Sequence, residues 1–179
     1  MRLSSLHPEY LDAKTGNEQM NNRTKSVLGF VVALTACYGA GGVGGLLVGG
    51  AARDWYPALV KPSWTPPAWV FGPVWTALYG MMAVAVWLVW LRRHQQSIAT
   101  PIVLFVVQLA FNMAWSPLFF GLHRPGIAFA DIMLLWLALV LTVRAFLRIH
   151  STAGVLLVPY LLWVSFAGVL NFAIWRMNT

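Results

Sequence analysis

Residues 55–75, WYPALVKPSWTPPAWVFGPVW, combine tryptophan and proline at high density and carry one charge, Lys61. The stretch lies between two long apolar runs, so it is expected to connect two membrane spans. Prolines restrict the freedom of the backbone, and tryptophan side chains present large apolar surfaces. The pattern therefore predicts a stiff aromatic connection that covers something at the end of the spans.

The composition around this stretch is that of an integral membrane protein. Of the 179 residues, 59% are hydrophobic and 9% are charged, whereas a soluble domain has about 25% charged residues. A membrane span needs about 20 apolar residues. Five segments reach that length, near 27–49, 67–91, 101–121, 126–147 and 153–175. We expect an all-α, five-transmembrane-helix bundle over residues 26–179, with residues 50–66 as its longest loop.

The charges bear on the N-terminal segment, the orientation and the partners. Residues 1–25 are polar and lack the layout of a secretory signal, so we expect a disordered tail. The net charge of +7 comes from tail and membrane-edge residues, which favours anionic lipid headgroups over nucleic acid as the partner. Lys and Arg number eight on the tail's side and four on the other. This bias predicts a cytoplasmic N-terminus if the membrane is the bacterial inner membrane, in the cell envelope.

The first span contains a glycine-rich stretch, GAGGVGGLLVGG, at residues 39–50. Gly41, Gly45 and Gly49 recur at every fourth position and form a ridge without side chains, which lets helix backbones approach closely. The ridge is interpreted either as packing within the bundle or as a homodimer contact. A phosphate-binding loop is not favoured, because no strand precedes the glycines and no Lys-Ser/Thr follows.

Three rows of polar and aromatic residues share helix faces within the spans. Carboxamides in mid-membrane are costly when they face lipid, so these rows are expected to face protein, a cavity or a ligand. Simple hydrogen bonding between helices is the alternative for Gln108 and Asn112. The rows are Trp75 and Tyr79; Gln108, Asn112 and Trp115; and Tyr160, Trp163, Ala167 and Asn171.

Catalytic motifs are weak in this sequence. The four histidines have no paired helical spacing, so no metal site is predicted, and hydrolase and P-loop motifs are missing. Asp131 is the only acid within the spans. Its place near a helix start suits either a structural role or a role with protons or substrate. An enzyme is therefore less favoured than a binding protein, and no cofactor is expected to be required.

Aromatic walls with a few placed polar groups are typical of ligand pockets. The rows predict a large, flat, apolar guest with a polar edge, and the first loop is expected to act as a lid over it. The alternative is a loop that lies in the headgroup layer. The predicted lid residues are Trp55, Lys61, Pro62, Trp64, Pro66 and Pro67.

Three stretches, residues 55–80, QLAFNMAWSPLFFG at 108–121, and LLVPYLLWVSFAGVLNFAIWRMN at 156–178, make the chain resemble the translocator protein family, also called tryptophan-rich sensory or peripheral-type benzodiazepine receptor proteins. The resemblance covers nearly all of residues 27–178. It implies a five-helix bundle that often dimerises and a pocket under the first loop. The pocket residues carried over by motif position are Tyr56, Trp75, Asn112, Trp163 and Ala167.

The ligands implied by this resemblance are porphyrins such as protoporphyrin IX, sterols in some lineages, and synthetic isoquinoline carboxamides. Sterols receive less weight, because Phe172 stands where sterol-binding members carry tyrosine. The implied role is tetrapyrrole sensing, regulation or transport. Light-dependent porphyrin degradation and a membrane scaffold that associates through the glycine ridge are the alternatives.

Overall fold

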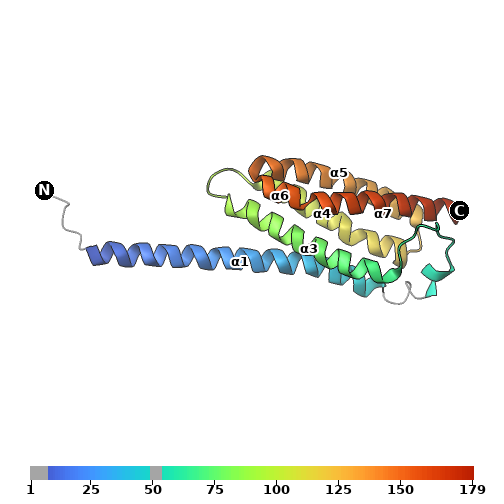
Figure 1. The fold of residues 1–179 in the computed structure, drawn as a ribbon, viewed down its shortest axis with the longest axis horizontal. Coiled ribbons are helices and arrows are strands. Elements are labelled where there is room, and N and C mark those ends of the chain that lie inside the picture. Colours follow the sequence, from blue (N-terminus) through green and yellow to red (C-terminus); the bar gives the residue numbers. More distant parts are fainter. Residues whose placement is uncertain (1–7, 49–53) are drawn as a thin grey trace.

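The computed structural model describes residues 8–48 and 54–179, which fold almost wholly into helices (Figure 1). Within these residues there is no strand. The long helices are α1 (Pro8–Val48), α3 (Ala68–Leu91), α4 (Ala99–Ser116), α5 (Pro125–Ile149) and α7 (Val158–Met177). The short ones are η1 (Tyr56–Ala58), the π-helical η2 (Pro117–Gly121) and α6 (Ser151–Leu156).

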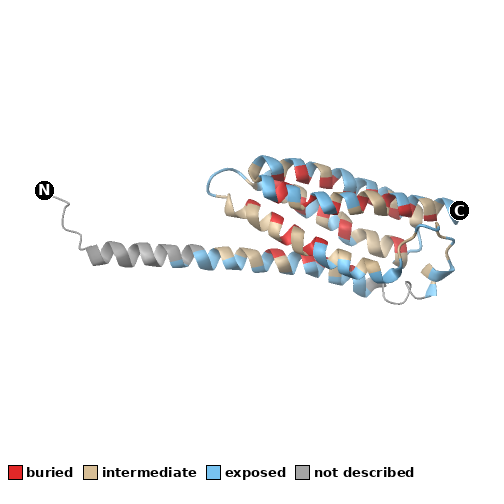
Figure 2. Cartoon of the chain, viewed as in Figure 1, coloured by how far each residue is buried: buried red, intermediate tan, exposed pale blue. Residues whose placement is uncertain are grey.

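Five segments of this fold are long and apolar enough to cross a membrane. They are Arg23–Leu46, Ala68–Leu91, Ala99–Gly121, Pro125–Ile149 and Ser151–Met177. The expected all-α bundle with five spans is thus confirmed, and the predicted ends differ from these by a few residues. Figure 2 shows exposed residues along the outer faces of the helices. Large apolar residues such as Leu46 and Leu162 are among the exposed ones, as expected for faces that a bilayer covers.

The first helix differs from the expectation for residues 1–25. Helix α1 begins at Pro8 and continues without a break into the first span, and Figure 1 shows it running well past the other helices. Proline suits the first helical turn, and many of the residues that follow it, such as Leu11, Lys14 and Glu18, are good helix formers. Residues 8–25 are therefore helical instead of disordered, while residues 1–7 lie outside the described residues.

Proline also shapes the end of the third span. Pro117 has no N–H to donate to the Met113 carbonyl, so the regular helix cannot pass through it unchanged. Helix α4 ends at Ser116, and the chain continues as the π-turn of η2. The Leu122 N–H closes that turn on the Pro117 carbonyl at 2.9 Å. This turn directs two phenylalanines, Phe119 and Phe120, toward the interior of the bundle.

Close approach of α1 to its neighbours depends on glycine. A Cβ added at Gly41 would collide with the Tyr79 ring of α3, and one at Gly44 would lie 3.3 Å from Ser116 Oγ of α4. The Tyr38 hydroxyl donates to the Thr76 carbonyl at 2.9 Å and fixes α1 against α3. Gly41 thus packs within the bundle, as one interpretation of the ridge expected, whereas Gly49 lies outside the described residues.

Candidate functional site

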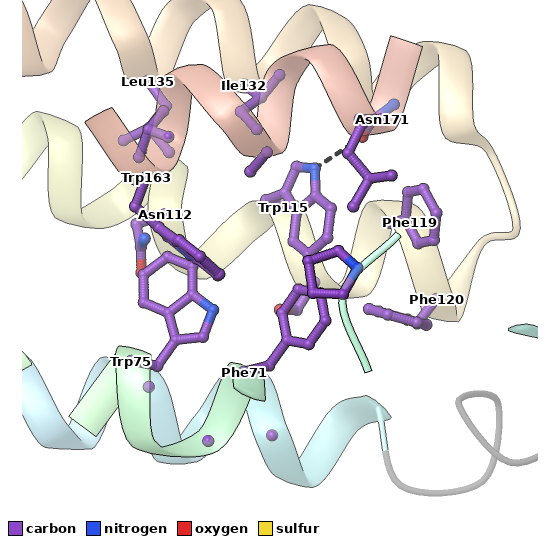
Figure 3. A pocket seen from close by; sticks show the side chains of 18 of the residues that line it. Phe71, Trp75, Asn112, Trp115, Phe119, Phe120, Ile132, Leu135, Trp163 and Asn171 are labelled. Atoms are coloured by element: carbon purple, nitrogen blue, oxygen red, sulfur yellow. Dashed lines mark hydrogen bonds between the residues drawn. The ribbon is translucent and has the colours of Figure 1, made fainter. Parts of the chain in front are cut away.

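A cavity of about 450 Å³ lies between the helices at the end of the bundle that carries residues 54–67 (Figure 3). This volume falls within the range of small-molecule pockets. The lining residues from α1 and the first loop are Gly41, Gly45, Tyr56 and Pro66. Those from α3 to η2 are Ala68, Phe71, Gly72, Trp75, Tyr79, Asn112, Trp115, Ser116, Phe119 and Phe120. Those from α5 and α7 are Ile132, Leu135, Trp163, Val164, Ala167, Leu170, Asn171 and Ile174.

The floor of the cavity is a hydrogen-bonded group of three side chains from three helices. The Tyr79 hydroxyl donates to Asn112 Oδ1 at 2.7 Å, and Asn112 Nδ2 donates to the Tyr160 hydroxyl at 2.8 Å. Tyr160 is 0% exposed and forms the side of the floor that faces away from the cavity, since the first α7 residue that lines the cavity is Trp163. The cavity therefore occupies only the loop-side part of the bundle.

The side walls are aromatic. Trp75 stacks on Tyr79 with ring centroids 5.4 Å apart, and Phe71 meets Trp163 edge-on at 5.8 Å. Figure 3 shows Phe71 and Trp75 projecting from α3 into the cavity. Within the described part of the chain, the indole nitrogens of Trp75 and Trp163 have no hydrogen-bond partner. Two N–H donors are thus free to meet the edge of a ligand.

The polar atoms of Trp115 and Asn171 are already used by the protein. Trp115 Nε1 donates to Asn171 Oδ1 at 2.9 Å, and Asn171 Nδ2 donates to the Pro125 carbonyl at 2.8 Å (Figure 3). The pair ties the end of α4 to α7 and to the start of α5. Both residues line the cavity as predicted, with the Trp115 N–H and part of the Asn171 amide engaged within the protein.

Lys61 holds the first loop in shape through hydrogen bonds to the backbone of that loop. Lys61 Nζ donates to the carbonyl oxygens of Tyr56, Pro57 and Leu59 at 2.9, 3.1 and 2.7 Å. The ammonium also lies 5.0 Å from the centre of the Tyr56 ring, a cation–π contact. Burial raises the pKa of the Tyr56 phenol above its usual value, so the hydroxyl keeps its proton for hydrogen bonding.

Further contacts tie the loop to the bundle. The Val60 N–H donates to Asn178 Oδ1 at 3.0 Å, and Asn178 Nδ2 donates back to the Val60 carbonyl at 2.8 Å. Trp55 stacks on His123 with centroids 4.4 Å apart, and Trp64 meets Phe166 edge-on at 5.9 Å. The described part of the loop therefore packs on the bundle as a lid would. Of the predicted lid residues only Pro66 lines the cavity.

Replacing Lys61 with methionine is expected to loosen this loop. Three hydrogen bonds from a charged donor are lost, so amide hydrogen exchange over residues 56–60 should rise by about tenfold. Exchange measured by mass spectrometry on the detergent-purified protein checks this. Arg124→Met, which removes an exposed cation at the same end of the bundle, should leave the loop unchanged. Equal exchange in both variants would mean that the lysine does not hold the loop.

Eight of the ten predicted ligand-binding residues line the cavity. Tyr160 supports the floor instead, and the expectation for Gln108 is corrected. Gln108 is 0% exposed and lies one turn below Asn112 on α4, beyond the floor. Neither polar atom of its amide has a partner in the described structure. Its face was predicted correctly, but the cavity ends above it.

Several cavity residues were missed by sequence reasoning. Helix α5 contributes Ile132 and Leu135, and η2 contributes Phe120. These are apolar residues in apolar spans, so no polar signal distinguishes them from lipid-facing neighbours. The one acid of α5, Asp131, is buried with Oδ2 unpaired and does not line the cavity.

The position that resembles the sterol motif lies outside the cavity. Phe172 is exposed and packs on Phe129 and Trp175 with centroids 5.2 and 6.1 Å apart. This aromatic group faces the bilayer side of α7.

Comparison with known proteins gives the family of this chain. The model of the TspO/MBR family matches residues 31–176, most of the chain. The chain belongs to the TspO/MBR family. It is 42% identical over 158 residues to the tryptophan-rich protein TspO of Chlorobaculum tepidum, covering 86% of this chain and 98% of that protein.

Other members of the TspO/MBR family have similar sequence identity to this chain. The human translocator protein is 42% identical over 138 residues, or 76% of this chain and 82% of the human protein. The tryptophan-rich sensory protein of Cereibacter sphaeroides is 40% identical over 149 residues, or 83% of this chain and 90% of its own length. The family and the five apolar helices identify an integral, multi-pass membrane protein.

Proposed function

We propose that the cavity binds a flat, apolar ligand of the tetrapyrrole class, such as protoporphyrin IX, and that the protein acts in tetrapyrrole sensing, regulation or transport. Membership of the TspO/MBR family supports a sensory or translocator role in the membrane. The observation that carries the ligand class is the cavity itself, where Trp75 and Trp163 form walls with free indole N–H groups.

The chemistry of the lining fits a ligand with two different parts. Phe71, Trp75 and Trp163 present aromatic faces and edges, which suit offset or edge-on contact with a conjugated ring system. The free indole N–H groups are donors, so they suit carboxylate or carbonyl oxygens on the ligand. Sterols are a second ligand class for the same apolar walls, although Phe172 lies outside the cavity.

The proposed orientation of the chain and its proposed assembly rest on its charges and on its outer surface. If the membrane is the inner membrane of a bacterial cell envelope, the Lys and Arg bias favours a cytoplasmic N-terminus. Helix α1 leaves Val43 and Leu46 exposed, and Gly42 beside them has no neighbouring atom near its Cβ position. This face supports a homodimer that packs along α1 in the bilayer.

The test is a titration of detergent-purified protein with protoporphyrin IX in the dark, followed by tryptophan quenching and corrected for inner-filter absorption. Trp75→Ala and Trp163→Ala are each expected to weaken binding at least about tenfold, because each removes a wall of the site. Trp69→Ala is the matched control, since Trp69 is 76% exposed and does not line the cavity. Wild-type affinity in both wall variants would overturn the proposal.

A second candidate function is light-dependent degradation of the bound porphyrin by dioxygen. The observation that favours it is the stack of Trp75 on Tyr79, which places two oxidisable side chains together at the cavity wall. Aerobic illumination should then yield an altered pigment with the intact protein only. Identical bleaching by Trp75→Phe protein, or by detergent alone, would remove this candidate.

A further inference from the structure

Ordered contacts hold both the floor of the cavity and the described part of the first loop. The floor is sealed by the hydrogen bonds that join Tyr79, Asn112 and Tyr160. The loop end is held by Lys61 on its own carbonyls and by the reciprocal pair between Val60 and Asn178. A ligand that passes the floor, or that displaces residues 56–61 of the loop, must first break several of these hydrogen bonds, which favours a route through a side wall.

The side wall between α1 and α3 is made of glycines at one level. Helices α1 and α3 run antiparallel, in contact where Tyr38 bonds Thr76 and where Gly41 meets Tyr79. One turn from Gly41 along α1, and one turn back from Thr76 along α3, the helices reach Gly45 and Gly72. Both glycines line the cavity, and both are exposed.

Nothing fills the space between these two glycines in the described structure. A Cβ added at Gly45 or at Gly72 would meet no other element within 4 Å. The neighbouring glycines differ, because Gly41 is covered by the Tyr79 ring and Gly44 by the Ser116 side chain. Gly39 and Gly42 are also open, but they do not line the cavity. In the described parts of α1 and α3, Gly45 and Gly72 are the glycines that are both open and part of the cavity lining.

The gap opens at a definite depth in the bilayer. Gly45 lies next to the last residue of the span Arg23–Leu46, and Gly72 lies in the second turn of Ala68–Leu91. With about 1.5 Å of rise per residue, both are within a few ångströms of the loop-side end of the hydrocarbon. A flat amphiphile with an apolar body and a polar edge concentrates at this boundary, as aromatic amphipathic groups do.

We propose that the gap between Gly45 and Gly72 is a lateral portal through which a flat, amphiphilic ligand passes between the loop-side leaflet and the cavity. This inference rests on the proposed function, because it takes the cavity as a ligand site. Passage from the bilayer spares the lid contacts, and it delivers the ligand beside Trp75, one turn along α3 from Gly72.

The test measures exchange rates of protoporphyrin IX in protein reconstituted into phosphatidylcholine vesicles. Gly45→Leu and Gly72→Leu are each expected to slow association and dissociation at least tenfold, with a much smaller change in Kd, since both directions use the portal. Ala110→Leu is the control, because Ala110 is exposed on α4, away from the α1 face, and does not line the cavity. Wild-type rates in both portal variants would overturn the proposal.

A second variant keeps the test independent of how leucine is tolerated. Val60→Cys with Asn178→Cys, joined by a bifunctional maleimide cross-linker, ties the lid to α7 where the Val60 backbone already meets the Asn178 side chain. Exchange at the wild-type rate in the locked protein supports the portal, whereas arrested exchange would show that the ligand passes under the lid. Failure of the wild-type protein to bind protoporphyrin IX at all would overturn the proposed function itself.

Discussion

Replacing Asn112 with leucine is expected to lower the free energy of unfolding by about 2–4 kcal/mol. The substitution nearly keeps the side-chain volume but removes the amide that both tyrosines share, so the hydroxyls of Tyr79 and Tyr160 lose these hydrogen bonds. Tyr160 is 0% exposed, and water cannot replace the lost bond there. Thermal unfolding of the detergent-purified protein, followed by circular dichroism, measures the change.

The control for Asn112→Leu is a second substitution in the same protein. Tyr160→Phe removes the stranded hydroxyl, so adding it to Asn112→Leu should restore part of the lost stability. In the wild-type background the same Tyr160→Phe change should be destabilising, because it leaves Asn112 Nδ2 with one partner fewer. Additive losses in the double variant would contradict this account of the floor.

Replacing Gly41 with alanine is expected to separate α1 from α3 and to lower the free energy of unfolding by about 2–3 kcal/mol, as overpacking in a core does. The new Cβ would collide with the edge of the Tyr79 ring and lie 2.8 Å from its Cζ. That ring cannot turn away freely, because its hydroxyl is held by Asn112. Resistance to unfolding by sodium dodecyl sulfate would report the loss.

Gly42→Ala is the matched control for Gly41→Ala. A Cβ at Gly42 meets no neighbouring element within 4 Å, so this substitution should be neutral or gain up to about 1 kcal/mol from helix propensity. A similar loss in both variants would mean that flexibility of the glycine-rich helix, instead of contact with Tyr79, sets the cost.

The spans could be predicted from the sequence because hydropathy alone decides which segments leave water. The cavity face of each helix could also be predicted where polar or aromatic residues recur at helical spacing. Trp75, Asn112 and Trp163 were found in this way. Ile132 and Leu135 could not be found, because apolar residues give the same signal toward a cavity, a neighbouring helix or lipid.

Depth along a helix was the harder property to predict. Gln108 and Asn112 share a face, yet only Asn112 reaches the cavity. The difference arises where Tyr79 and Tyr160, on other helices, meet Asn112 and close the floor above Gln108. Helical periodicity gives the direction of a side chain but not the level at which distant parts of the chain converge.

The hydrogen-bond partners of individual side chains could not be predicted from the sequence either. Asn171 was predicted to line the ligand site, and the sequence did not show that its amide bonds Trp115 and the Pro125 carbonyl. The long first helix was also not foreseen, because polar composition was read as disorder although the residues after Pro8 favour helix.

The closed floor has a consequence for vectorial movement. A cavity with a closed floor has no path to the other side of the membrane, so a molecule that enters it from one leaflet can leave only to that leaflet. Net translocation requires a second arrangement in which the Asn112 hydrogen bonds break and the passage past Gln108 opens, an alternating-access cycle that needs a driving gradient. If the proposed ligand binds through the proposed portal, this arrangement would hold it, and occupancy of the cavity would follow the ligand's concentration in one leaflet. That is the behaviour of a detector.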